Sequence, residues 1–387
     1  MVKRVIILVL DSVGIGHAPD AIKYGDEGAS TLSDTARAVG GLKIPNLRRM
    51  GLGNIEPQEI LGCEPVEAPI ASFGRMTEVS CGKDTTTGHW EMIGCQVKEP
   101  FATFPEGFPV DFLEKWKRET GQKGYLCNRP ISGTVVIEEL GEEHLRTGFP
   151  IVYTSADSVF QIAAHEEKFG LENLYALCEK TRKLVDPLRV GRVIARPFVG
   201  NCAANFKRTP NRRDYSFAPP SPNLLTALTK KGLPFYAIGK ISDIYAGVGV
   251  TKSVHTVSNN DGMDKLNAAL AEQPNGLIFI NLVDFDMLYG HRRNPKGYAE
   301  CLEEFDRRLG PLLLSLGRDD ALFITADHGL DPTYKGTDHT RERVPILAYL
   351  PSHESISLGT RETFADLGAT VAQLLEVEKP ICGRSFF

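Results

Sequence analysis

The amino-acid sequence predicts an α/β protein with a doubly wound, mostly parallel sheet and a smaller domain inserted into it. Two apolar runs, at residues 276–283 (GLIFINLV) and 321–325 (ALFIT), are rich in branched side chains. Such runs are typical of strands that are buried on both faces of a parallel sheet. Segments with helical spacing separate several of the runs, and this alternation predicts the doubly wound arrangement.

Eight strand-like runs and three helical segments give the expected order of elements. The strands are predicted at residues 5–10, 73–79, 150–154, 193–199, 234–238, 277–283, 322–325 and 344–350. The helices are predicted at residues 224–231, 297–316 and 364–375. Gly232 is a plausible C-cap of the first helix, and Tyr298, Leu302 and Phe305 recur at helical spacing in the second.

Proline-rich junctions mark the limits of the predicted insertion. Residues 99–101 (EPF) lead into the middle of the chain, and residues 218–222 (APPSP) lead out of it. We predict a metal-binding catalytic core formed by residues 1–99 and 218–387, and an inserted α+β cap domain formed by residues 100–217. An insertion of about a hundred residues is a common domain size.

Composition excludes several classes of protein. The chain has 387 residues, of which 42% are hydrophobic, and a net charge of −5, so it lacks the basic surface that nucleic-acid binding requires. The apolar run at residues 5–10 is cut short by Asp11, and no run approaches the roughly 20 apolar residues of a membrane span. The eight cysteines are dispersed without a Cys-x-x-Cys pair, which favours a reducing, cytoplasmic location.

Aspartate and histidine residues follow the ends of three predicted strands. They are Asp11, Asp286, His291, Asp327, His328 and His339. The carboxyl ends of strands are where open α/β sheets bind ligands. Six such residues suit two metal ions, each with an open position, as in metal-assisted phosphoryl transfer. Mixed carboxylate and imidazole ligands suit Mn²⁺ or Zn²⁺, and three histidines favour Mg²⁺ less. Taken singly, each residue also has a structural interpretation, such as a capping Asp11 or a buried Asp327–His328 pair.

Residues 82–91 (GKDTTTGHWE) form a threonine-rich segment after the strand predicted at residues 73–79. It is not a Walker loop, because Asp84 stands where Ser or Thr is required. The segment is either an ordinary turn that opens a helix or a nucleophile elbow. In the second case a threonine hydroxyl at a helix N-terminus, activated by metal, would attack phosphorus. Gly14 and Gly16 do not form a dinucleotide fingerprint, because Pro19 stands in place of the third glycine.

Basic residues of the predicted cap are candidates for an anion site. Arg196 ends one strand, and Arg208, Arg212 and Arg213 follow in a basic stretch. Such a cluster is usually a solvated face, but arginine also binds phosphate bidentately. Lys240, which follows the strand at residues 234–238, is a further candidate.

Taken together, these motifs resemble the phosphopentomutases of the alkaline phosphatase superfamily over nearly the whole chain. The matching segments are residues 11–16, 82–91, 153–158, 208–215, 239–245, 284–291, 327–329 and 339–342. The string at residues 82–91 is highly specific to that family, whereas the last two segments are shared more widely in the superfamily.

The resemblance implies an enzyme that interconverts ribose 1-phosphate and ribose 5-phosphate, and their 2-deoxy forms, with two Mn²⁺ ions. It implies that Thr85 is the phosphorylated nucleophile. One metal would then be held by Asp11, Asp327 and His328, and the other by Asp286, His291 and His339. Ser155 and Asp157 would contact the sugar, and Arg196, Arg208, Arg212 and Lys240 would bind its distal phosphate. A sugar bisphosphate would serve as activator.

Three other functions compete with this one. A metal-dependent phosphate-monoester hydrolase would use the same nucleophile and metals but pass the phosphoryl group to water. A cofactor-independent phosphoglycerate mutase usually carries serine as nucleophile on a longer chain. A non-catalytic sugar-phosphate-binding protein would have lost metal ligands, and all six are present in this sequence.

Overall fold

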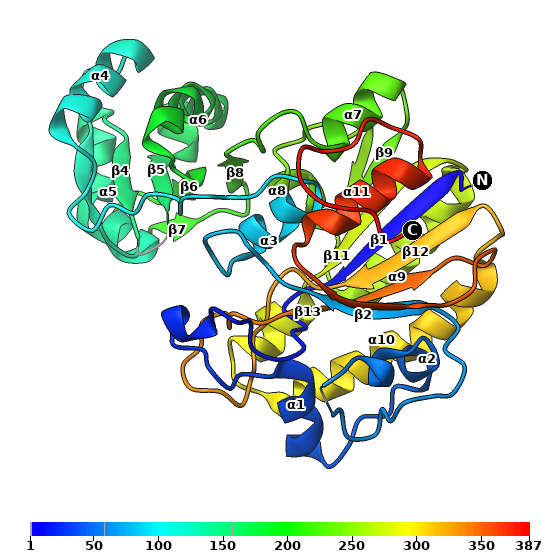
Figure 1. The fold of residues 1–387 in the computed structure, drawn as a ribbon. Coiled ribbons are helices and arrows are strands. Elements are labelled where there is room, and N and C mark those ends of the chain that lie inside the picture. Colours follow the sequence, from blue (N-terminus) through cyan, green and yellow to red (C-terminus); the bar gives the residue numbers. More distant parts are fainter. Residues whose placement is uncertain (1, 58, 156–157) are drawn as a thin grey trace. The chain divides into compact units, whose positions relative to one another are not determined.

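The computed structural model describes residues 2–57, 59–155 and 158–387, and these form two compact units (Figure 1). One unit comprises Met1–Glu99 and Pro219–Phe387, and the other comprises Pro100–Ala218. The sequence places the second boundary between residues 217 and 218, whereas in the structure it lies between Ala218 and Pro219. That the second unit acts as a cap on the first stays a prediction.

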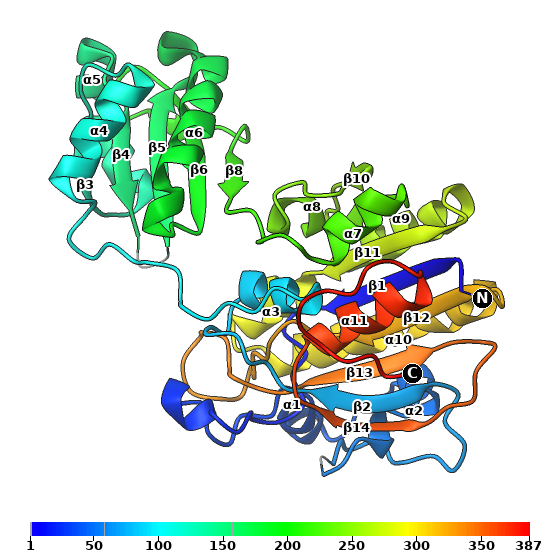
Figure 2. The same cartoon turned by 45° about the horizontal axis from the view of Figure 1, so that its top comes forward.

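The first unit is built on an eight-stranded sheet with the order β10-β9-β11-β1-β12-β13-β2-β14 (Figure 2). The strands are β1 (Arg4–Leu10), β2 (Ser72–Met76), β9 (Phe235–Ile238), β10 (Lys252–Val254), β11 (Gly276–Leu282), β12 (Asp320–Thr325), β13 (Val344–Tyr349) and β14 (Ser357–Arg361). Strand β13 is antiparallel to β12 and β2, and the other neighbouring strands are parallel. The predicted mostly parallel sheet is therefore confirmed.

Helices cover both faces of this sheet, which makes it doubly wound (Figure 2). Helices α3 (Thr85–Met92), α7 (Leu224–Lys231) and α11 (Ala365–Leu374) lie on one face. Helices α1 (Thr31–Val39), α2 (Pro45–Arg49) and α10 (Pro295–Ser315) lie on the other. The remaining helical segments are α8 (Ile241–Ile244), α9 (Asn259–Glu272), the 3₁₀ turns Ala21–Tyr24 and Leu52–Asn54, and the π-helix η5 (Phe285–Gly290).

The predicted strands and helices of this unit are present, with shifts at their ends. The strand predicted at residues 73–79 ends at Met76 as β2. Beyond it, the backbone N–H of Val79 donates to the Glu91 carboxylate at 3.1 Å. Strands β10 and β14 were not predicted, because they are short edge strands in which polar residues interrupt the apolar pattern.

The second unit is a six-stranded mixed sheet with the order β3-β4-β5-β6-β7, and β8 also pairs with β6. Its strands are β3 (Leu126–Pro130), β4 (Ile151–Thr154), β5 (Val159–His165), β6 (Arg192–Val199), β7 (Lys207–Arg208) and β8 (Arg213–Ser216). Its helices are α4 (Val110–Thr120), α5 (Gly133–Thr147) and α6 (Leu171–Val185), with shorter turns at Glu166–Gly170 and Asp186–Leu188.

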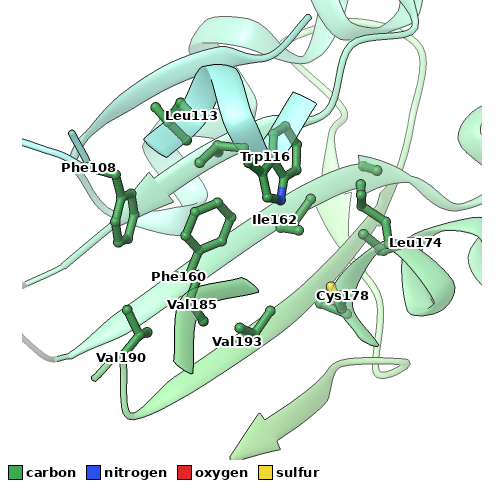
Figure 3. Close-up of a cluster of buried hydrophobic side chains, with 14 of the residues drawn as sticks. Phe108, Leu113, Trp116, Phe160, Ile162, Leu174, Cys178, Val185, Val190 and Val193 are labelled. Atoms are coloured by element: carbon green, nitrogen blue, oxygen red, sulfur yellow. The ribbon is translucent and has the colours of Figure 1, made fainter. Parts of the chain in front are cut away.

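Side chains of the second sheet alternate between two apolar clusters. Trp116 of α4 and Phe160 of β5 lie in the larger cluster, which α6 completes (Figure 3). Val136 and Ile137 of α5 form the smaller cluster, together with Tyr153 of β4. Because neighbouring residues of a strand point to opposite faces, Tyr153 lies on the α5 side of the sheet.

Trp116 is expected to be a main source of stability in the second unit. It is fully buried, its Nε1 donates to Thr181 Oγ1 at 2.8 Å, and it packs against Phe160 with the ring centroids 5.9 Å apart. Trp116→Ala should lower the opening free energy of β5 amides, measured by hydrogen exchange, by about 3–5 kcal/mol. Val110→Ala on the same helix, where the side chain is 68% exposed, should change it by less than about 0.5 kcal/mol. Equal effects of the two variants would contradict this account of the core.

Candidate metal centre and nucleophile loop

Three neighbouring strands bring the predicted ligands to one edge of the first sheet. Leu10 of β1 lies opposite Leu282 of β11, and Val9 lies opposite Thr325 of β12. Parallel neighbours end at the same edge, so the segments that follow them meet there. Asp11 follows β1, Asp286 lies in η5 after β11, and Asp327 and His328 follow β12. His291 comes after η5, and His339 lies in the loop between β12 and β13.

Two groups of these side chains have ligand atoms within 4.8 Å of one another. Asp286, His291 and His339 form one group, and Asp11, Asp286 and His328 form the other. Asp286 thus belongs to both. Asp327 lies next to the second group, with its Oδ2 3.4 Å from His328 Nε2. The structure therefore brings all six predicted residues together.

The three histidines share one orientation. The Nδ1 atoms of His291, His328 and His339 lie 2.7, 3.1 and 2.9 Å from the backbone oxygens of Thr337, Gly329 and Lys83. A backbone oxygen can only accept, so Nδ1 carries a proton in each ring and Nε2 is directed toward the carboxylates. The Nε2 atoms of His291 and His339 each lie 3.3 Å from Asp286, and that of His328 lies 3.5 Å from Asp11. This arrangement is typical of metal-binding histidines, whose other nitrogen is fixed by a hydrogen bond.

Several buried polar atoms at this edge have no hydrogen-bond partner among the described residues. They are Asp11 Oδ1, Asp286 Oδ1, Asp327 Oδ2 and His339 Nε2. Orphaned buried polar atoms are costly and rare in folded proteins. Here they belong to side chains of the two ligand groups and to the neighbouring Asp327, so divalent cations would satisfy them. The residues present therefore fit the metal centre that the motif predicts.

The carboxylates also show an excess of buried negative charge. Burial raises the pKa of Asp11 well above its usual range, and the charges of Asp327 and Asp286 raise it further, while Lys240 opposes them. Burial also disfavours charge on Asp286, but hydrogen bonds with His291 and His339 outweigh it and lower the pKa. The hydrogen bond to Asp286 raises the pKa of His291 to about 9. A proton on His291 thus offsets part of the negative charge of Asp286.

Thr85 is the first residue of α3 and faces this centre. The Asp84 side chain caps the helix by accepting from the N–H groups of Thr86 and Thr87 at 3.0 and 3.2 Å. Thr85 Oγ1 lies 3.3 Å from His328 Nε2, which places the hydroxyl beside the candidate ligands. The segment is therefore a capped helix start with its first hydroxyl directed at the metal centre.

Two residues that follow His339 hold the surrounding loops, and the sequence did not mark them as structural. Arg341 is 2% exposed and donates to the Glu78 carboxylate and to the backbone oxygen of Gly82, each at 2.5 Å. Glu342 is buried and accepts from the backbone N–H groups of Gly16 and Thr31. The sequence signal that could have identified them is the presence of two charged residues shortly after the candidate ligand His339.

Two further residues near the centre have roles that sequence reasoning missed. A Cβ on Gly14 would lie 2.3 Å from Glu342 Oε2, so this glycine makes room for a buried carboxylate and does not serve a dinucleotide. Asn281 donates from Nδ2 to Asp11 Oδ2 at 3.0 Å. Its signal was a single amide within the apolar run at residues 276–283.

The predicted substrate residues are divided between the two units. In the second unit, the charges of Arg196, Arg208 and Arg212 all act on the buried Tyr153, whose pKa burial raises to about 12 against their effect. Arg212 also forms a two-pronged ion pair with Asp214. Ser155 lies just after β4, and Asp157 lies outside the described residues.

Two basic residues lie apart from that arginine group. Lys240 belongs to the first unit, where its charge acts on Asp11. Arg213, which the sequence groups with Arg208 and Arg212, lies over the rings of Tyr175 and Tyr215 at 5.2 and 5.3 Å. Arg213 is therefore engaged in the packing of its own unit.

Comparison with known proteins agrees with this fold and site. The model of the metalloenzyme superfamily matches residues 3–379, which defines the class of protein. A phosphopentomutase of Symbiobacterium thermophilum is 57% identical over 387 residues, covering 100% of this chain and 98% of that protein. A phosphopentomutase of Anaeromyxobacter dehalogenans is 54% identical over 384 residues, covering 99% and 97%. This chain belongs to the phosphopentomutase family within the metalloenzyme superfamily.

Solved structures at low identity share the fold. The PH0037 protein of Pyrococcus horikoshii aligns with a TM-score of 0.52 at 13% identity, covering 97% of this chain and 98% of that one. A phosphoglycerate mutase of Leishmania mexicana aligns with a TM-score of 0.50 at 13% identity, covering 100% and 98%. Among the described residues, the helices are each too short or too polar to cross a bilayer.

Divalent metal is expected to stabilise this protein through Asp286, the residue shared by both ligand groups. Mn²⁺ at 100 times its dissociation constant should stabilise the wild type by about 2.7 kcal/mol, seen as a rise in Tm that a chelator reverses. Asp286→Asn should remove most of that rise. Asp284→Asn is a matched control, because the Asp284 carboxylate accepts from the Asn259 N–H at 2.7 Å and belongs to neither group. A full metal response in Asp286→Asn would contradict the assignment.

Proposed function

We propose that this chain interconverts ribose 1-phosphate and ribose 5-phosphate, and their 2-deoxy forms, by way of a phosphothreonine enzyme. Full-length relatives at 51–57% identity are phosphopentomutases, which supports this reaction class. The observation that carries the proposal is the position of Thr85 Oγ1, 3.3 Å from a histidine of the candidate metal centre. A hydroxyl at a capped helix start beside two ligand groups is suited to carry a phosphoryl group.

The proposed cofactor is a pair of Mn²⁺ ions, for which Zn²⁺ and Mg²⁺ are alternatives. Asp11, Asp327 and His328 would hold one ion, and Asp286, His291 and His339 the other. The orphaned carboxylate oxygens and the shared orientation of the three histidine rings support this donor set. Bound metal would offset negative charge on the transferring phosphoryl group and favour the alkoxide form of the threonine oxygen.

The proposed reaction has two phosphoryl transfers that mirror each other. Phospho-Thr85 gives its phosphoryl group to the free hydroxyl of a pentose monophosphate. The bond from phosphorus to Thr85 Oγ breaks, a bond to the sugar oxygen forms, and the hydroxyl proton is passed in net terms to Thr85. The pentose 1,5-bisphosphate then turns end for end, and its other phosphate returns to Thr85. A sugar bisphosphate activator would supply the first phosphoryl group.

Residues of the second unit would retain this intermediate. Arg196, Arg208 and Arg212 would bind the phosphate that is not reacting, and the influence of these three charges on Tyr153 supports a common anion site. Lys240 is a further candidate for binding that phosphate. Ser155 and Asp157 would contact the sugar. Exclusion of water by a cap would suppress hydrolysis of the phosphoenzyme. The cytoplasmic location stays a prediction.

Conversion of ribose 1-phosphate tests this function directly. With added Mn²⁺ the protein should form ribose 5-phosphate, and a chelator should abolish the activity. Free phosphate measured in the same reaction separates a mutase from a hydrolase, because a hydrolase releases it in proportion to turnover. Release of free phosphate without ribose 5-phosphate would favour the hydrolase, which the relatives support less.

Thr85→Ala is expected to abolish turnover, because the phosphoryl group loses its carrier. The variant should also take up no phosphoryl group from ribose 1,5-bisphosphate, measured by intact-protein mass. Thr86→Ala provides a matched control in the same helix turn, and it should stay within a few-fold of wild type, because the Asp84 cap contacts the backbone N–H of Thr86. Substantial mutase activity in Thr85→Ala would rule out this nucleophile.

A further inference from the structure

His89 is a fully buried histidine that no step of the proposed reaction uses. It lies four residues after Thr85 in α3, and therefore on the same helix face, one turn later. Its Nδ1 lies 2.8 Å from the backbone oxygen of Thr85 and 3.2 Å from Oδ2 of Asp327. One ring nitrogen thus contacts both the candidate nucleophile and a candidate metal ligand.

The contacts define how the proton of His89 is placed. Nδ1–H donates to the backbone oxygen of Thr85, and Oδ2 of Asp327 lies 3.2 Å from the same nitrogen. Its Nε2 is buried and has no hydrogen-bond partner among the residues that the structure describes. The ring stacks on Phe279 with the centroids 5.9 Å apart, which fixes its plane. Among the described residues, His89 therefore makes its polar side-chain contacts through Nδ1.

Close packing of α3 on Asp327 is a second, independent observation. A Cβ on Gly88 would lie 2.0 Å from the backbone oxygen of Asp327, so the helix approaches this residue as closely as the absence of a side chain allows. Oδ1 of Asp327 accepts from the Ser12 N–H at 3.1 Å, and His89 meets the other oxygen. The carboxylate consequently has a polar neighbour at each of its oxygens.

A similar connection exists at the other end of the nucleophile loop. Nδ1 of His339 donates to the backbone oxygen of Lys83, two residues before Thr85, at 2.9 Å. Backbone carbonyls on both sides of the loop are thus tied to the two ligand groups. His89 differs from His339 in that its Nε2 faces no carboxylate, so it is not itself a candidate ligand.

We propose that His89 is a positioning residue that couples the Thr85 backbone to the Asp327 carboxylate through its Nδ1–H. The inference rests on the proposed roles of Thr85 and Asp327. A shared donor fixes the rotation of the carboxylate and the distance from the hydroxyl to the metal centre at the same time. Misplacement by about 1 Å can cost about 10²-fold in rate, so such a coupling is valuable in phosphoryl transfer.

The alternative is that His89 only fills space in the core. Two amide substitutions separate these roles, because the Asn amide reaches the position of Nδ1 whereas the Gln amide reaches that of Nε2. His89→Asn should keep Mn²⁺ affinity and kcat within about 10-fold of wild type. His89→Gln should lower both by about 10- to 100-fold, the usual effect of losing a group that orients a metal ligand. The KM for ribose 1-phosphate should change little, because His89 does not touch substrate.

Calorimetric titration of the metal-free variants with Mn²⁺ measures the difference in Mn²⁺ affinity between His89→Asn and His89→Gln, even if the protein has no mutase activity. Wild-type turnover then tests the proposed function separately. Tyr245→Phe is the matched control, because its hydroxyl donates to the backbone oxygen of His89 at 2.7 Å. That variant should lower Tm and leave Mn²⁺ affinity within about 2-fold of wild type.

Two results would overturn the inference. The first is equal Mn²⁺ affinity in His89→Asn and His89→Gln, which would leave only a packing role. The second result concerns the case in which His89→Gln does not fold. A loss of more than about 10-fold in the Mn²⁺ affinity of His89→Asn would then show that a donor at the Nδ1 position is insufficient.

Discussion

Buried negative charge at the edge of the first sheet is the constraint on which the rest of the structure depends. Asp11, Asp286 and Asp327 are each at most 8% exposed, and the charges of Asp286 and Asp327 act on Asp11 against that of Lys240. Such a cluster is costly in a low-dielectric interior unless a cation joins it. Burial and neighbouring carboxylates raise the pKa of Asp11, and the hydrogen bond to Asp286 raises the pKa of His291. A divalent metal is therefore expected to stabilise the fold as well as to take part in the chemistry.

The loops around the cluster are organised to keep its lone pairs pointing inward. Backbone oxygens take the Nδ1 protons of the ligand histidines, so the histidines cannot rotate without losing a hydrogen bond. Arg341 and Glu342 tie the loop that carries His339 to the loops after β1 and β2. The nucleophile helix is docked on Asp327 through Gly88 and His89. Rigid support of this kind preorganises the site before substrate arrives.

The two units carry different kinds of functional side chain, and this difference suggests different roles for them. The first unit holds the candidate metal ligands and the Thr85 hydroxyl, the groups that the proposed phosphoryl transfer requires. The second unit carries the arginines around Tyr153 and no candidate metal group among its described residues. A mutase differs from a hydrolase in retaining its intermediate. The features that would retain the intermediate are therefore expected in the second unit.

The sequence by itself determined the sheet type and the chemical class of the site. The hydrophobic pattern and the branched side chains identify buried parallel strands such as β1 and β11. The aspartates and histidines that follow these strands are residue types that bind metal, so they indicate the chemistry of the site. The local sequence pattern does not predict which residues distant in the chain will be in contact, and such contacts determined the detailed geometry of the site. Only the tertiary structure showed that Asp286 is shared between the two ligand groups, that Asn281 contacts Asp11, and that His89 bridges Thr85 and Asp327. Short polar edge strands such as β14 also form only because a neighbour supplies their hydrogen bonds, which no local signal encodes.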